Sequence, residues 1–533
     1  MDNILSDSSA NSANQEAQPV GLQKPADGAS SDSSAAAAKQ DAKQPVGLYW
    51  LFGAEAWERF SYYGMRAILV LYLVNQLTYE RADALKLYGI YTAMVYLTPM
   101  LGGYLSDKFL GPRKAVIIGG CSMAIGELLL SVPSMLYPAL TLLVLGNGFF
   151  KPNISNIVGG LYKENDPRRD GGFTIFYMGI NLGAFFAPLV CGTLGQNFGY
   201  KYGFIAAGIG MILGQIIFNI GQSRFQGAGM PPGFNPETDG EARLKTKDYV
   251  QAVMWIGGVL AVDAAGFLFY KLTDAVSPIV ASVIIAAAVT AVLHYMTGKS
   301  GGNSAEKEQA EAQALTTEEK ERIWVIVILA MFVSCFWLGF EQAGGTMTLF
   351  AENHTQRILE CFNNFEIPAS WFQSINPFII CTFAPLFSIL WYKWDNSKYA
   401  ISIPVKMSLG MIILGLGFIL MFTANSFTHG GADKVTPLWL ISVYFLHTMG
   451  ELCLSPVGLS MVSKLAPHRL MSIMMGFWFL SSAIANFFAG TLEHLLESFQ
   501  INLWAFLIGS SIGPGLLLLA LTPILKKWMH GKA

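Results

Sequence analysis

The stretch Glu55-Ala-Trp-Glu58-Arg59-Phe-Ser-Tyr62-Tyr63-Gly-Met-Arg66 decides the fold of this chain. It lies inside an apolar run from about residue 48 to 77, and roughly 20 residues suffice for a helix to cross a bilayer. At about 100° per residue, the four charged residues and Tyr62 share one helix face. Each charge on a membrane helix costs about 2.5–3.5 kcal/mol by insertion scales, so such residues usually line an ion or substrate path. We therefore expect this face to border an aqueous cavity; the alternative is a self-neutralised stripe that only fixes helix packing.

The composition is that of a membrane protein. Of 533 residues, 53% are hydrophobic and only 13% are charged, and the mean hydropathy is +0.43. Soluble proteins carry about 25% charged residues. The net charge of −2 and the lack of a basic domain argue against a nucleic-acid partner. No nucleophile–base pair or metal-spaced cluster is evident, so we expect neither an enzyme nor a metal site.

Apolar runs recur from residue 48 to the C-terminus and predict an all-α protein of fourteen transmembrane helices. The spans are expected at 48–77, 86–107, 113–135, 138–161, 172–195, 201–221, 249–271, 276–297, 322–350, 370–394, 401–424, 436–463, 471–496 and 502–527. These give a disordered tail (1–46), a six-helix bundle (47–221), a linker (222–248), an inserted hairpin (249–298), a second linker (299–321) and a second six-helix bundle (322–528).

The distribution of Lys and Arg predicts the orientation, because cytoplasmic loops carry an excess of these residues. Of the 34 Lys and Arg residues, 25 fall on the same side as both termini and six on the other, while Arg59, Arg66 and Lys151 lie within spans. Both termini are therefore expected in the cytoplasm, in a multi-pass protein of the cell inner (plasma) membrane.

The loop after the second span, Gly102-Gly-Tyr-Leu-Ser-Asp107-Lys108-Phe-Leu-Gly111-Pro-Arg113-Lys114, is similar to the signature loop of the major facilitator superfamily. It differs by one extra residue before the second glycine and by the proline that follows. Together with the six-plus-six helix count, this resemblance implies two pseudo-symmetric halves around a central cavity near the bilayer midplane.

Isolated polar residues within other spans are further candidates for the site. Lys151 and Glu451 lie in opposite halves without a charged neighbour in sequence, so we expect them to attract each other across the cavity. Arg66 and Glu341 form a second expected pair. Asn181 and Asn376 are amides in the middle of spans, and an interhelical hydrogen bond explains either of them equally well.

These residues together resemble the bacterial type of the proton-dependent oligopeptide transporter family (POT/PTR). The family motif ExxERFxYY matches from Glu55 to Tyr63, FYxGINxG matches Phe176–Gly183, and FFKPN, FExxG-like and ExxxSPxGLS stretches match around Lys151, Glu341 and Glu451. The resemblance covers about residues 48–528, including the extra helix pair; the long N-terminal tail is unusual. It implies symport of di- and tripeptides, and of peptide-like drugs, with protons.

A peptide zwitterion needs a cationic pole, an anionic pole and adaptable walls, and the candidate residues provide all three. The cationic pole would consist of Arg59, Arg66, Lys151 and Tyr63, the anionic pole of Glu451 with Asn181 and Asn376, and the walls of Tyr62, Tyr96, Trp337 and Trp478 with Ser482. Glu55 and Glu58 are the expected proton carriers, beside Arg59, and Glu341 is the next candidate, because a desolvated carboxylate gains proton affinity when a guanidinium moves away. The proton is the coupling ion, and no cofactor is expected.

Two other functions remain open. One is a carrier of the same superfamily for another small solute, such as an amino acid, nitrate or a peptide-like drug. A lone anion would not need the complete anionic pole, which argues against nitrate. The other is a sensor that has lost transport, which the intact coupling charges argue against.

Overall fold

Fourteen long helices run through the part of the chain that this computed structural model describes, namely residues 43–163, 166–234, 242–273, 277–298, 315–360, 363–398 and 401–531. By their internal contacts, residues Pro45–Ala533 form one unit. Most of the predicted tail (1–46) and of the second predicted linker (299–321) lies outside the described residues. The first helix begins at Val46, at the end of the predicted tail.

The first half of the bundle contains six long helices, two of which end in a π-helical turn. The elements are α2 (Val46–Asn75), α3 (Arg81–Leu105), η1 (Ser106–Leu110), α4 (Pro112–Leu130), η2 (Pro133–Met135), α5 (Leu136–Gly160), α6 (Arg169–Ala187), η3 (Pro188–Gly192), α7 (Thr193–Phe198), α8 (Tyr200–Gly221) and η4 (Gln222–Arg224).

The inserted hairpin has two long helices, and the second half again has six. The elements are α10 (Thr246–Thr273), α11 (Pro278–Gly298), α13 (Thr317–Phe340), η5 (Glu341–Gly344), α14 (Thr346–His354), β1 (Ile358–Leu359), β2 (Phe365–Glu366), η7 (Ala369–Ser374), α15 (Ile375–Asp395), α16 (Ile403–Ser426), η8 (His429–Gly431), α17 (Leu438–Leu465), η9 (His468–Leu470), α18 (Met471–Ser498) and α19 (Leu503–Trp528). The two short strands pair antiparallel.

Within the described residues, eleven helical segments are long and apolar enough to cross a membrane. The helices α2, α3 and α4 fall outside this set although they pack inside the same bundle. Charged residues within α2 and α4 exclude these two helices from the set. Tyrosines, glycines and a proline lower the mean hydropathy of α3. Helices that bury polar side chains against neighbouring helices can have a lower mean hydropathy than helices that face lipid.

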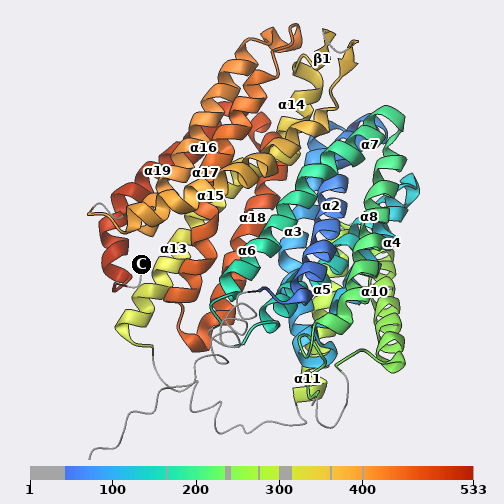
Figure 1. The fold of residues 1–533 in the computed structure, drawn as a ribbon. Coiled ribbons are helices and arrows are strands. Elements are labelled where there is room, and N and C mark those ends of the chain that lie inside the picture. Colours follow the sequence, from blue (N-terminus) through green and yellow to red (C-terminus); the bar gives the residue numbers. More distant parts are fainter. Residues whose placement is uncertain are drawn as a thin grey trace, which may run out of the picture. The chain divides into compact units, whose positions relative to one another are not determined.

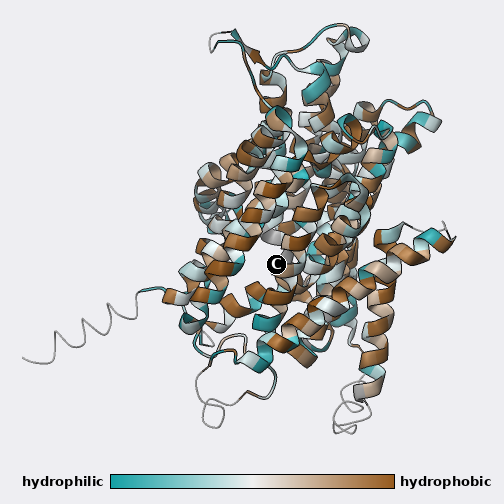
Figure 2. Ribbon diagram, turned by 90° about the vertical axis from the view of Figure 1, so that its right-hand side faces the viewer, coloured by the Kyte–Doolittle hydropathy of each residue, from teal (hydrophilic) through white to brown (hydrophobic). Residues whose placement is uncertain are grey.

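Lipid-facing positions are apolar on the outer helices. Only 22–28% of the most apolar window is buried in α10, α11, α15 and α19. Large hydrophobic side chains such as Val253, Met254 and Leu516 are exposed there, as membrane-facing surfaces require. Figure 2 shows hydrophobic residues along the long helices and hydrophilic residues gathered toward the helix ends and loops.

The two halves meet where small residues let helices approach closely. Helix α3 packs along α18, and a Cβ atom added to Gly89 would lie 2.7 Å from the Cα of Gly490. Helix α6 packs against α15 (Figure 1). The hairpin α10–α11 packs against α3, α4 and α5 of the first half. Small residues at such crossings are typical of membrane helix packing.

One predicted span is broken, and the break matters for the site. The predicted helix 322–350 ends at Phe340, turns through η5 and restarts as α14 after Gly345. A glycine pair, Gly344 and Gly345, loosens the backbone at this point. Glu341 consequently lies at the interruption, where a membrane helix tolerates irregular backbone only beside protein or a cavity.

Candidate functional site

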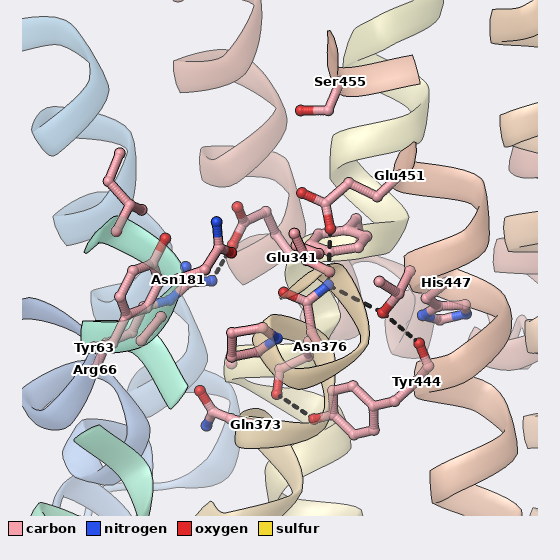
Figure 3. A pocket seen from close by; sticks show the side chains of 18 of the residues that line it. Tyr63, Arg66, Asn181, Glu341, Gln373, Asn376, Tyr444, His447, Glu451 and Ser455 are labelled. Carbon is pink, nitrogen blue, oxygen red and sulfur yellow. Dashed lines mark hydrogen bonds and ion pairs between the residues drawn. The ribbon is translucent and has the colours of Figure 1, made fainter. Parts of the chain in front are cut away.

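A cavity of about 220 Å³ lies between the two halves (Figure 3). Its walls come from α2, α3, α6 and η3 of the first half and from α13, η5, η7, α15 and α17 of the second. Eight of the predicted site residues line it: Tyr63, Arg66, Tyr96, Asn181, Trp337, Glu341, Asn376 and Glu451.

Arg66 joins the halves across this cavity. Its guanidinium forms an ion pair with Glu341 of η5, 275 positions away in sequence, and donates a second hydrogen bond to the hydroxyl of Tyr88 on α3. The side chains of Arg66 and Glu341 are 12% and 4% exposed. Desolvation makes a fully paired arrangement necessary, because a lone buried charge is strongly unfavourable. The pair therefore links the two halves directly across the cavity.

Glu451 is held by an amide rather than by a cation. Asn376, in the first turn of α15, donates from Nδ2 to Oε2 of Glu451 at 2.8 Å and to Oγ1 of Thr448 at 3.1 Å. The Asn376 amide therefore bonds across to α17, although Pro377 follows it. Asn181 differs, because its Nδ2 donates to the carbonyl of Tyr177 on its own helix at 3.0 Å.

Four charged residues form a cluster beside the cavity instead of lining it. Arg59 contacts Glu58 through two nitrogens and lies 3.7 Å from Glu55, whose Oε1 also accepts from Lys151 Nζ at 2.5 Å. The amide oxygen of Asn147 lies 3.5 Å from Arg59. Of the charges predicted to face the cavity from α2, only Arg66 lines it. In this conformation Glu55, Glu58 and Arg59 are balanced by Lys151 of α5, and Arg66 pairs with Glu341 of the other half, so the charges of α2 do not neutralise one another by themselves.

The expected pairing of Lys151 with Glu451 is not what the structure shows. Lys151 on α5 pairs with Glu55 on α2, inside the same half, and Glu451 is bonded to Asn376. Helices α2 and α5 are in contact, so the carboxylate on the neighbouring helix is closer than the one across the cavity. Glu55 is a competing partner for Lys151 that the separation of the two residues in sequence conceals.

Three further predicted wall residues also lie outside the cavity lining. Tyr62 is 7% exposed and packs edge-on against Tyr63 with ring centroids 5.2 Å apart. Trp478 is 6% exposed and lies over Gly458, and Ser482 is 8% exposed with its carbonyl accepting from Asn486. In this conformation they are packing residues around the site.

Several lining residues were not predicted, and one of their patterns was visible in the sequence. Tyr444, Thr448, Glu451 and Ser455 all line the cavity from α17. Their spacing of i, i+4, i+7 and i+11 places them on one helix face. Because Glu451 was already a candidate, this spacing would have predicted that the other three also line the cavity. Tyr177 and Gln373 also line the cavity; Gln373 precedes Asn376 by three positions, although η7 and not an α-helix carries it.

Polar contacts between the halves gather at the end of the bundle where α2 ends and α3 begins, the upper end in Figure 1. Asn75 donates to Glu352 at 2.9 Å, Arg81 pairs with Glu493, and Gln196 accepts from the backbone and hydroxyl of Ser370. Trp371 Nε1 donates to Thr193 at 2.9 Å. With the Arg66–Glu341 pair, these contacts close that end of the cavity.

A two-half helical bundle with a charged cavity at its centre defines a membrane carrier. The sequence profile of the POT family matches residues 113–508. The chain is 37% identical over 497 residues to an uncharacterized transporter, YclF, of Bacillus subtilis, covering 91% of this chain and 95% of the relative. It is also 34% identical over 483 residues to the peptide transporter YePEPT of Yersinia enterocolitica, covering 86% and 89%. The chain belongs to the POT family.

Solved structures agree with this assignment. A crystal structure of a peptide transporter POT in complex with sulfate superposes with a TM-score of 0.74 at 34% identity, covering 92% of this chain and 96% of the other. A POT family transporter in complex with 5-aminolevulinic acid gives a TM-score of 0.73 at 30% identity, covering 90% and 97%. The fold is thus the expected arrangement of two six-helix halves with an inserted helix pair.

Proposed function

We propose that this protein is a proton-coupled symporter that imports di- and tripeptides by alternating access across the inner membrane. One observation carries the proposal: the cavity between the halves is lined by the guanidinium of Arg66 from one half and by the carboxylate of Glu451 from the other. A zwitterionic peptide presents one anion and one cation, so it can satisfy both groups at once. The similarity to peptide transporters supports the same substrate class.

The balance of charge in the cavity supports proton coupling. Its lining includes two carboxylates, Glu341 and Glu451, but one guanidinium, Arg66. A peptide carboxylate that binds Arg66 would compete with Glu341 for the same donor. A displaced and desolvated carboxylate takes up a proton, and the proton then travels with the peptide. Glu55 and Glu58 of the neighbouring cluster remain the first candidates for the proton carriers, with Glu341 next, and the proton is the proposed coupling ion.

The orientation and the conformational state fit import. With both termini in the cytoplasm, as the Lys and Arg distribution indicates, the end closed by the Arg66, Asn75 and Arg81 contacts faces outward. The described conformation is then one in which contacts between the halves close the outer end. A carrier that alternates in this way needs no catalytic group, and its partners are the peptide, the proton and the surrounding bilayer.

Uptake into proteoliposomes tests the proposal directly. Purified protein is reconstituted, and a labelled dipeptide is offered with an inward proton gradient, with no gradient, and with the gradient collapsed by an ionophore. Accumulation only in the first condition supports proton-driven symport. Competition by unlabelled dipeptides but not by nitrate or free amino acids supports the substrate class. Failure of a panel of dipeptides to accumulate under any gradient would exclude the function.

A further inference from the structure

The carboxyl group of Glu127 is buried in the first half with no role in the proposed cycle. Glu127 lies on α4 and is 0% exposed. Its Oε1 accepts a hydrogen bond from the Ser61 hydroxyl of α2 at 3.3 Å, and its Oε2 has no partner within the described residues. By contrast, Glu55, Glu58 and Glu341 each contact a cation.

Among the residues that the structure describes, no cation forms an ion pair with Glu127. The titratable groups that interact with it electrostatically are Glu58 on α2, Tyr91 on α3 and Cys191 in η3, and none of them is a cation. Helix α8 packs so closely that a Cβ atom added to Gly208 would lie 3.3 Å from the Cβ of Glu127. This leaves no room there for a compensating side chain. An ionised carboxylate in such a place loses its hydration without gaining a partner.

We propose that Glu127 is a further proton-binding residue of the coupling mechanism, and that it holds its proton in the conformation closed at the outer end. This inference rests on the proposed symport and adds a site behind the cavity. Ser61 connects the two, because it lies on α2 one helical turn after Glu58 and hydrogen-bonds Glu127 directly. The proposal requires that α2 shifts relative to α4, within the first half, when the outer end opens, so that the Ser61 contact breaks. Glu127 can then meet water and release its proton.

The Glu127→Gln variant separates this role from a purely structural one. Glutamine reproduces the shape of a protonated glutamate but cannot ionise. If Glu127 only stabilises packing as a neutral acid, the variant will match the wild type in gradient-driven accumulation and in the pH profile of uptake, and that result would overturn the proposal. We expect instead a loss of accumulation, with exchange of internal for external peptide retained.

Infrared spectroscopy of the purified protein supplies a readout that does not depend on transport. A protonated carboxylic acid gives a C=O stretching band that Glu127→Gln should remove and Ser61→Ala should shift. A saturating dipeptide should change the wild-type band. Absence of any such band at neutral pH would contradict the proposal, even if Glu127→Gln failed to fold. A wild type with the band but without peptide uptake would instead refute the proposed symport.

A matched control is available in the hairpin. Asp263 on α10 is 6% exposed and interacts with the hydroxyl of Thr141 on α5. It is thus also a buried acid beside a hydroxyl, but it lies apart from α2. Asp263→Asn should leave accumulation unchanged. Equal losses in Asp263→Asn and Glu127→Gln would show that any buried acid matters for folding, and would count against a specific role of Glu127.

Discussion

The ammonium group of Lys151 lies 2.5 Å from Oε1 of Glu55, and the same oxygen lies 3.7 Å from Nε of Arg59. Because Arg59 also pairs with Glu58, two cations and two carboxylates form one neutral cluster between α2 and α5. Protonation of either carboxylate would leave a cation in excess inside the membrane. Under the proposed function, we expect the pairing in this cluster to change when a proton or an anionic substrate arrives.

Glu58→Gln should abolish gradient-driven peptide accumulation but leave exchange measurable. The substitution keeps the shape of the protonated acid, so the carrier can still change conformation, but it removes one of the two carboxylates of the neutral cluster. Proteoliposomes with and without an inward proton gradient measure the two activities. Continued accumulation of peptide against its gradient would show that Glu58 is not an obligatory carrier.

Charge reversal of Arg66 or Glu341 alone should cripple transport, and the double swap should recover part of it. Each single reversal places like charges together in a desolvated contact, whereas the double variant restores an ion pair between the halves. Contacting residues show interaction energies of about 0.5–3 kcal/mol in double-mutant cycles. Additive losses in uptake would mean that this contact does not limit the cycle.

Glu451→Gln should weaken binding of free dipeptides by about tenfold or more, because hydrogen bonds to charged groups contribute about 1.5–3 kcal/mol. Binding of N-acetylated peptides, which lack the ammonium group, should change much less. Binding assays on the purified protein compare the two ligands. Ser455→Ala, which alters the same helix face without a charge, is the matched control. Equal losses for free and blocked peptides would remove Glu451 from the anionic pole.

Arg113→Ala should destabilise the fold by about 3 kcal/mol, since it removes several hydrogen bonds made by a buried charged group. The guanidinium of Arg113 is 0% exposed and donates to the carbonyls of Gln226, Ala228 and Ala242 at 2.6–2.8 Å. Thermal unfolding in detergent measures the change in Tm. Arg243 directly follows Ala242 in sequence and is exposed, so Arg243→Ala should shift Tm little. An equal shift of Tm in both variants would contradict this account.

The sequence by itself determined the class of protein and most of its helices, and it singled out candidate residues for the site. Apolar runs predicted the spans because a bilayer requires satisfied backbone over about 20 residues, although α2, α3 and α4 are less apolar than the other long helices. The cost of membrane charges singled out Glu55, Glu58, Arg59 and Arg66 before any fold was known. Motif resemblance then indicated the family to which the chain belongs.

The tertiary structure decided which of these charges meet. Arg66 finds Glu341, as their positions in the two halves suggested, but Lys151 takes Glu55 from the adjacent helix and leaves Glu451 to Asn376. Helical periodicity gives the face on which a residue lies, but not which neighbouring helix that face meets or how far away it is. Pairing depends on distances of a few ångströms between helices that are remote in sequence, and only the packed bundle sets those distances.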